Sequence, residues 1–313
     1  MFPLSNLNFK TPAFFALMVM LVIMSLGPIY LIFINSFKLD RDIISGASGL
    51  IFMPTLQNYE TALCDALWYM PDHLRRCPFK IGDAMINSLV IALVSTILTL
   101  VIGCMAAYAI VRFRFIGREL MSLSTLILRM VPPAVLLVPV FGLWNNTFCI
   151  DKDTVFGAFL KELFNARGDV CLAGTYSGII LIYVAMNLPF VIWILQSFIV
   201  QVPRQLEEAA RIDGAGPYRV FFTIVLPLIQ PGLAAAAIFT FRIAWNEFLL
   251  ASVLADRNTQ TVPMLIVNNT SEFNIEWGVI MATGMLLAIP PIIFTLLASR
   301  QIVTGMTAGA VKG

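Results

Sequence analysis

Residues 203–227 read PRQLEEAARIDGAGPYRVFFTIVLP and form a charged, proline-bounded interruption in a strongly apolar chain. Pro203 suits the first turn of a helix, where a missing amide hydrogen costs no hydrogen bond. Glu207 and Glu208 follow it closely, where the helix dipole favours negative charge. The start of this stretch therefore predicts a short helix between two apolar regions.

The rest of the stretch predicts a turn and a second helix. Ala209 and Ala210 are strong helix formers with small side chains, so another surface can approach them closely. Asp213-Gly214 ends the first helix, because glycine accepts the left-handed conformation that closes a helix. Pro217 can restart the chain, and a second helix is expected to run to Pro227. We expect a helix–turn–helix that lies against a membrane face.

Composition indicates a membrane protein. The chain has 313 residues, of which 59% are hydrophobic and 12% are charged, and its mean hydropathy is +0.87. A soluble domain carries about 25% charged residues. The formal net charge is only +2, and no basic run predicts a nucleic-acid partner. We expect a single polytopic domain over residues 1–313, with lipid as its surroundings.

Six stretches are long and apolar enough to cross a bilayer, which takes about 20 residues of helix. They must be helices, because lipid offers no partner for unpaired backbone groups. The predicted fold class is therefore an all-α membrane protein with six transmembrane helices. The expected spans are residues 14–34, 86–110, 120–143, 177–200, 232–254 and 279–298, with the polar loop at 201–231.

The orientation follows from the short loop 111–119. Six spans place both termini on one side of the membrane. Arg112, Arg114 and Arg118 crowd into this loop of nine residues, beside two spans. Because arginine and lysine accumulate in cytoplasmic loops, the charge favours cytoplasmic termini and a cytoplasmic loop 201–231.

The polar loop resembles the EAA loop of ATP-binding-cassette import permeases. The matching positions are Glu208-Ala209-Ala210, then Gly214 after three residues, then Ile224, Leu226 and Pro227 after nine more. In that family the loop docks in a cleft of a separate ATPase and passes its closure to the spans. The resemblance implies an ATPase-coupling set of Glu207, Glu208, Ala209, Ala210, Asp213, Gly214 and Pro217.

Further motifs narrow the resemblance to carbohydrate-type permeases, in particular the smaller permease subunit of maltose-type importers. These motifs are Asn87-Ser88-Leu89-Val90, the run AAYAIVRFRF at 106–115 and Trp245-Asn246-Glu247-Phe248. The resemblance implies a type I importer permease fold in a bacterial inner membrane. It also implies four partners: a second homologous permease, two ATPase subunits and an extracytoplasmic solute-binding protein. The expected solute is a sugar, oligosaccharide or polyol.

The chain itself is not expected to be an enzyme. It contains no G-x-x-x-x-G-K-[ST] phosphate loop. ATP and Mg²⁺ are therefore expected on the partner ATPase, with no cofactor in this chain. We find no catalytic triad, and with one histidine, His73, we expect no histidine-based metal cluster.

Polar residues inside the apolar stretches are candidates for the solute path. A charge near mid-membrane is expensive and usually faces protein or water. The candidates are Arg242, Trp245, Asn246, Glu247 and Asn187. Trp245 would offer an aromatic face to a sugar ring. The same charges could instead pair with the partner permease or reach the membrane surface. Arg129, beside Pro132-Pro133, is expected in a kinked, packed helix more than at a ligand site.

Four of the five cysteines fall in two predicted outer loops. Two cysteines in each loop are what local crosslinks in an oxidising periplasm would require. We hypothesise the disulfides Cys64–Cys77 and Cys149–Cys171. Cys104 lies inside the second span and is expected to be a small apolar residue.

Three other functions stay open on the sequence alone. An importer of peptides, phosphate or another non-sugar solute would share the coupling loop. An ion-coupled secondary transporter would use Arg129, Arg242 and Glu247 as coupling charges, but the chain shows no internal repeat and the loop would have no role. A membrane scaffold without transport is disfavoured by the charges within the spans.

Overall fold

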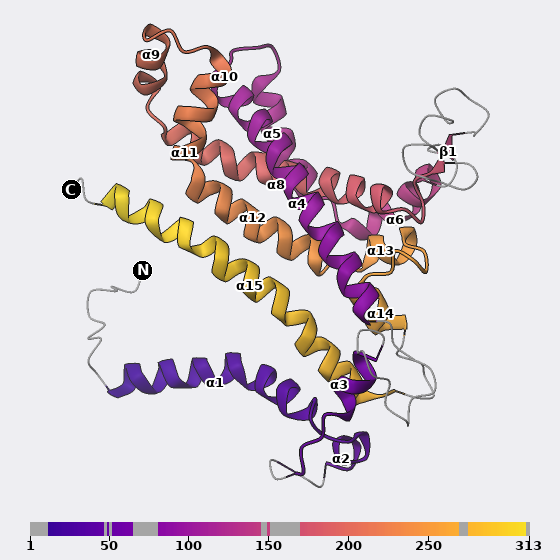
Figure 1. Ribbon diagram of the computed structural model, residues 1–313. Coiled ribbons are helices and arrows are strands. Elements are labelled where there is room, and N and C mark those ends of the chain that lie inside the picture. The colour runs from indigo at the N-terminus through magenta and orange to yellow at the C-terminus, as the bar shows by residue number, and fades with distance from the viewer. Residues whose placement is uncertain are drawn as a thin grey trace. The chain divides into compact units, whose positions relative to one another are not determined.

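The computed structural model describes residues 12–46, 49, 52–64, 81–144, 149–150, 170–268 and 275–310, and these are almost entirely helical (Figure 1). The elements are α1 (Pro12–Asn35), α2 (Asp40–Ser45), α3 (Gln57–Ala62), α4 (Ile81–Arg112), α5 (Arg118–Arg129), α6 (Pro133–Gly142), β1 (Cys149–Ile150), β2 (Val170–Cys171), α8 (Tyr176–Gln201), α9 (Arg204–Ile212), α10 (Pro217–Val220), the π-helical η3 (Phe221–Val225), α11 (Leu226–Leu228), α12 (Gln230–Trp245), α13 (Leu249–Leu254), α14 (Val262–Asn268) and α15 (Trp277–Ala310).

Four of these helices, α1, α4, α8 and α15, are each long and apolar enough to cross a membrane. The predicted stretches 14–34, 86–110, 177–200 and 279–298 lie inside them. Two further pairs of helices pass the same test only together, and each pair is bent. The described residues therefore hold four candidate spans, or up to six if each bent pair counts as one.

The predicted third span, residues 120–143, is broken into α5 and α6, whose axes differ by 98°. The cause is Pro132-Pro133, which cannot donate backbone hydrogen bonds to the preceding turn. Pro133 instead occupies the first position of α6, where its missing amide hydrogen costs nothing.

The predicted fifth span, residues 232–254, is also divided. Helix α12 ends at Trp245, and α13 begins at Leu249 after a short break. The Glu247 carboxylate accepts the backbone amide hydrogens of Leu250 and Ala251, at 2.9 and 3.0 Å, and so starts α13 as a new helix. At its other end, α12 is bent by 74° from the helical segment Pro217–Leu228.

Contacts between α-carbons divide the chain into two compact units. The first comprises residues 1–82 and 268–288 and contains α1, α2, α3 and the start of α15. Within it, Asn58 Nδ2 donates to the carbonyls of Ser36 and Lys38, at 2.9 and 2.7 Å. The Gly278 amide donates to Asp40 Oδ1 at 2.6 Å, which fixes the start of α2 to the start of α15.

The second unit comprises residues 83–267 and 289–313 and carries the main apolar core. Helices α4, α8 and α12 and the π-helical η3 supply this core, and in Figure 1 α9 and α10 lie at one end of the unit, away from α13 and α14. Its members include Ala107, Val111, Val191, Leu195, Ile199, Phe221, Val225, Ile229 and Ala236. The core thus joins the ends of α4 and α8 to the segment that follows α9.

The opposite end of this unit is held by the start of α4. Asn87 Nδ2 donates to the carbonyls of Asn258 and Gln260, at 3.1 and 3.0 Å. Ser88 Oγ accepts the amide hydrogen of Val262 at 2.9 Å. The Asn-Ser pair that opens the second apolar stretch therefore anchors the loop between α13 and α14.

Candidate coupling site

Helix α9 and its turn are built by the residues that the sequence singled out. Pro203 precedes α9 in an extended conformation, and Asp213 closes the helix. Gly214 has a φ of 84°, which is the left-handed region that favours glycine. The Ala215 amide donates to the Ala210 carbonyl at 2.9 Å, and Pro217 takes the first position of α10. The second helix continues as a helical segment to Leu228, through the π-helical turns of η3.

The two adjacent glutamates of α9 have opposite surroundings. Glu207 is buried, with 3% of its surface exposed, whereas Glu208 is exposed. Successive residues of a helix point about 100° apart, so neighbours can face the protein and the solvent respectively. Glu207 therefore belongs to the interior of the chain, and Glu208 to its surface.

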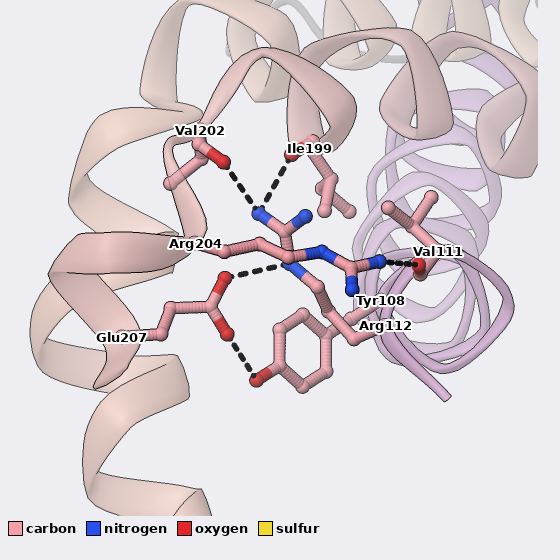
Figure 2. A network of polar contacts seen from close by, with 7 residues as sticks. All are labelled: Tyr108, Val111, Arg112, Ile199, Val202, Arg204 and Glu207. Atoms are coloured by element: carbon pink, nitrogen blue, oxygen red, sulfur yellow. Dashed lines mark hydrogen bonds and ion pairs between the residues drawn. The ribbon is translucent and has the colours of Figure 1, made fainter. Parts of the chain in front are cut away.

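Glu207 forms a buried ion pair with Arg112, the last residue of α4 (Figure 2). Arg112 Nε lies 2.6 Å from Glu207 Oε1, and both side chains are at most 7% exposed. The Tyr108 hydroxyl, one turn earlier on α4, donates to Glu207 Oε2 at 3.0 Å. Both oxygens of the carboxylate are thus held by α4, as a buried charge requires.

Arg112 also binds the end of α8. Its Nη2 donates to the carbonyls of Ile199 and Val202, at 2.9 and 2.8 Å (Figure 2). A cation at a helix C-terminus is favoured by the helix dipole and satisfies carbonyls that lack a partner within the helix. One guanidinium therefore fastens the ends of α4 and α8 to the first turn of α9.

Arg204 makes a second link between the same elements. It starts α9, and its Nη2 donates to the Val111 carbonyl near the end of α4 at 3.4 Å. Figure 2 shows this contact beside the Arg112 network. Helix α9 is consequently tied to α4 through both its first residue and its buried glutamate.

The outer surface of this helix–turn–helix is open in the isolated chain. Glu208 and Ala209 are exposed, Ile212 is 86% exposed, and Tyr218 on α10 is 77% exposed. Large apolar side chains gathered with charges on one exposed surface mark a contact site for another protein. The arrangement thus leaves one face of the helix–turn–helix exposed and holds the other face to α4 and α8.

Some of the predicted solute-path residues are exposed in the structure and others are buried. Arg242 and Asn246 are exposed. Trp245 is only 1% exposed and stacks on Phe241 with ring centroids 5.7 Å apart. Asn187 is also buried, and its Nδ2 donates to the Tyr183 carbonyl at 2.8 Å. Trp245 and Asn187 therefore pack within this chain instead of facing outward.

Glu247 has structural contacts for both oxygens. Besides receiving the two amide hydrogens at the start of α13, it accepts the Tyr183 hydroxyl hydrogen at 2.9 Å. Its carboxylate therefore joins α8, α12 and α13 at the point where the predicted fifth span breaks.

Of the two predicted disulfides, one joins residues that are partners in the backbone register of a strand pair. Cys149 and Cys171 are directly opposite each other in the antiparallel ribbon of β1 and β2. Cys64 is disulfide-bonded, whereas its hypothesised partner Cys77 lies outside the described residues. Cys104 is a free, buried thiol.

The sequence analysis missed two residues of the site, Arg112 and Tyr108. In the sequence, Arg112 stands out as a positive charge beside the membrane, and both Arg112 and Tyr108 belong to the family motif at 106–115. The sequence signal for the ion pair is that Arg112 ends an apolar stretch and Glu207, far along the chain, has the opposite charge.

Among the described residues, no group of three or more histidine, cysteine, aspartate or glutamate side chains gathers as metal ligands.

Comparison with known proteins gives a consistent family. The model of the family described as binding-protein-dependent transport system inner membrane component matches residues 99–306. The trehalose transport system permease protein SugB of Mycobacterium tuberculosis is 38% identical over 235 residues, which cover 74% of this chain and 77% of that protein. The trehalose/maltose transport system permease protein MalG of Thermococcus litoralis is 33% identical over 297 residues, 94% of each chain.

Solved structures share the fold at low sequence identity. A chain of a bacterial ABC transporter involved in the import of the acidic polysaccharide alginate has a TM-score of 0.62 at 17% identity, over 92% of this chain and 94% of that one. A chain of the inward-facing MetNI methionine ABC transporter has a TM-score of 0.51 at 17% identity, over 72% and 95% of the two chains. These likenesses establish the fold alone.

Proposed function

This chain belongs to the family of binding-protein-dependent transport system inner membrane components, and we propose that it is the permease subunit of an ATP-driven importer of a sugar, oligosaccharide or polyol. Named relatives include permeases for trehalose, for trehalose and maltose, and for diacetylchitobiose. The similarity to the trehalose/maltose permease extends over 94% of this chain. A carbohydrate is therefore the solute class that these relatives favour.

We propose that the whole chain forms one permease domain with six spans and cytoplasmic termini. The four long helices and the two bent pairs supply the six membrane crossings. The arginines of loop 111–119 support a cytoplasmic position for the ends of α4 and α8. Helix α9 would then lie on the cytoplasmic face, where a cytoplasmic ATPase can reach it.

The proposed assembly contains a second homologous permease, two ATPase subunits and an extracytoplasmic binding protein. ATP and Mg²⁺ would be bound by the ATPase subunits, with no cofactor in this chain. Glu208, Ala209, Ala210, Asp213, Gly214 and Pro217 would form or shape the surface that docks on the ATPase. Glu207 has a different part, because it is buried against α4.

The observation that carries this mechanism is the buried pair of Arg112 and Glu207. When an ATPase moves α9, the ion pair and the bonds from Arg112 to the α8 carbonyls transmit that motion to the ends of two spans. A link through flexible, exposed side chains would absorb the displacement. In this account the solute path opens alternately to the two sides as α4 and α8 follow α9.

ATP hydrolysis by the reconstituted complex tests the function. The chain is co-expressed with its partner permease, ATPase and binding protein, and hydrolysis is measured with a panel of sugars and polyols. We expect one compound to stimulate hydrolysis strongly and to be taken up only with ATP. Hydrolysis that no sugar or polyol changes would contradict the carbohydrate assignment. Failure of any ATPase subunit to co-purify would contradict the importer itself.

A further inference from the structure

Two exposed arginines lie in the apolar part of the second unit without a compensating acid. Arg129 ends α5 and Arg242 lies near the end of α12, and both are exposed. Among the described residues, the ion pairs are Arg41–Asp42 and Arg112–Glu207, so neither guanidinium has a carboxylate partner there. A charge inside a membrane faces protein or a water-filled cavity, because lipid cannot solvate it.

Aromatic rings connect the two positions. The Arg129 guanidinium carbon lies 4.5 Å from the centre of the Phe190 ring on α8. Phe190 meets Phe239 of α12 edge to face, with centroids 6.0 Å apart. Phe239 is 48% exposed, and Arg242 follows it by three positions on the same helix face. Three helices thus contribute to one surface of cations and rings.

The positions of Arg129, Phe190 and Arg242 on their helices indicate similar depths in the membrane. Arg129 is eleven positions from the start of α5, about 16 Å along a helix, and Arg242 is three positions, about 4.5 Å, past Phe239, whose ring contacts Phe190. Phe190 is eleven positions before the end of α8, again about 16 Å. Half of a hydrocarbon core is about 15 Å. With the topology proposed above, Arg129 and Phe190 lie near the middle of the membrane, and Arg242 lies about one helical turn from that depth.

The backbone beside Arg129 also requires a polar neighbour. Helix α5 ends there, α6 starts at Pro133, and Met130 between them is 80% exposed. Irregular backbone at this depth is tolerated only where protein covers it or water reaches it. Prolines at 132 and 133 leave the preceding carbonyls without their usual helical donors. This break therefore belongs on a path or an interface, and not against lipid.

We propose that Arg129, Phe190, Phe239 and Arg242 form this chain's contact with the solute at mid-membrane, and that the solute is an acidic sugar carrying a carboxylate or phosphate. Guanidinium groups bind such anions through paired, charge-assisted hydrogen bonds. The exposed Phe239 ring offers an apolar surface to the sugar ring, as aromatic side chains do in ligand sites. A neutral solute would leave both positive charges uncompensated.

This inference rests on the proposed importer function and is tested in the same reconstituted complex. Uptake into proteoliposomes is measured for a uronic-acid disaccharide, a sugar phosphate and an uncharged disaccharide, each with the binding protein present. We expect an acidic sugar to be transported. Arg129→Gln and Arg242→Gln should each raise the concentration for half-maximal uptake about tenfold, because each removes a charge-assisted bond. Arg129→Lys keeps the positive charge but cannot form the paired bonds, so it should lose less affinity than Arg129→Gln.

The control is Arg114→Gln, which removes an exposed arginine from the cytoplasmic loop and should leave uptake unchanged. Basal ATP hydrolysis without solute reports separately on the proposed function and should persist in all variants. ATP-driven uptake of uncharged sugars alone would overturn the inference and leave the importer standing. Separation of the two permeases on size-exclusion chromatography after Arg129→Gln would assign these arginines to the subunit interface and also overturn it.

Discussion

At the scale of single residues, Glu207 and Glu208 show how one helix can serve the interior and a partner together. Glu207 is paired with Arg112 inside the chain, while Glu208 points into solvent. Removing one member of a buried ion pair leaves the other charge without compensation, which costs far more than the loss of a surface charge. Substitutions of the two glutamates should therefore have different effects on the stability of the protein.

We predict that Glu207→Ala destabilises the permease by about 3–5 kcal/mol, because Arg112 stays buried without its carboxylate. Glu208→Ala should change stability by less than about 1 kcal/mol and instead weaken ATPase attachment. Thermal denaturation of the purified complex gives the stability, and co-purification gives the attachment. Equal melting temperatures for the two variants would contradict this division of roles.

Gly214 is the second residue whose conformation decides the site. Its φ of 84° costs a β-branched residue about 1–3 kcal/mol, and a Cβ there meets no other atom within 4 Å. Gly214→Val should therefore disturb the turn after α9 and lower the solute transported per ATP hydrolysed. Gly214→Asn is the matched control, because asparagine tolerates the left-handed region. Loss of coupling in both variants, or in neither, would count against a conformational role.

Glu276 should make the first unit sensitive to pH. Burial, together with the negative charge of Asp40, raises the pKa of the Glu276 carboxyl. The folded state therefore favours the protonated form of Glu276. Its contribution to the free energy of unfolding is present at low pH and is lost as the pH rises through the folded-state pKa.

Glu276→Gln should accordingly raise the melting temperature near pH 7.5 and have little effect near pH 4, where the wild-type carboxyl is protonated. Melting curves of the two proteins at several pH values test this. A stabilisation that is equal at both pH values would show that ionisation is not its cause.

At the scale of elements, the helices followed from hydropathy and Pro132-Pro133 indicated the first bend, but the break after Trp245 did not follow from the sequence. The apolar stretches 14–34 and 177–200 cover nearly the whole of α1 and α8, respectively. This agreement arises because length and apolarity decide whether a segment can span the membrane. The stretch 232–254 is also long and largely apolar, yet α12 ends at Trp245. The break depends on the hydrogen bonds of Glu247 to α13 and Tyr183, which are tertiary contacts that no local pattern reveals.

The same limit applies to the coupling site. The turn after α9 could be predicted from Asp213, Gly214 and Pro217, since each has a strong local preference. The burial of Glu207 could not, because Arg112 and Tyr108 lie about a hundred positions away in the sequence. Only the fold brings the end of α4 against the start of α9.

Helices α8 and α12 approach each other closely at Gly232. A Cβ on this residue would overlap the ring of Phe198. Gly232→Ala should therefore separate the two helices and destabilise the complex by about 1–3 kcal/mol, measured by thermal denaturation. Gly284→Ala is the control, because a Cβ there meets nothing within 4 Å. Recovery of stability in Gly232→Ala combined with Phe198→Leu would show that the ring causes the loss.

At the scale of the whole molecule, the second unit has two distinct ends. The helix–turn–helix of α9 and α10 lies at one end, and the loop held by Asn87 and Ser88 lies at the other (Figure 1). Helix α4 reaches from one to the other, with Asn87 near its start and Arg112 at its last residue. A rigid helix of this length can carry a displacement from an ATPase to the far side of the membrane.

The central claim is that α9 docks on the ATPase, and crosslinking tests it most directly. Ala209→Cys, on the exposed face of α9, would be labelled with a photoreactive maleimide in the assembled complex. Arg257→Cys, in the loop before α14, serves as the control. We predict an adduct between Ala209→Cys and the ATPase subunit and none from Arg257→Cys. An ATPase adduct from position 257 alone, or none from position 209 in an active complex, would contradict the account.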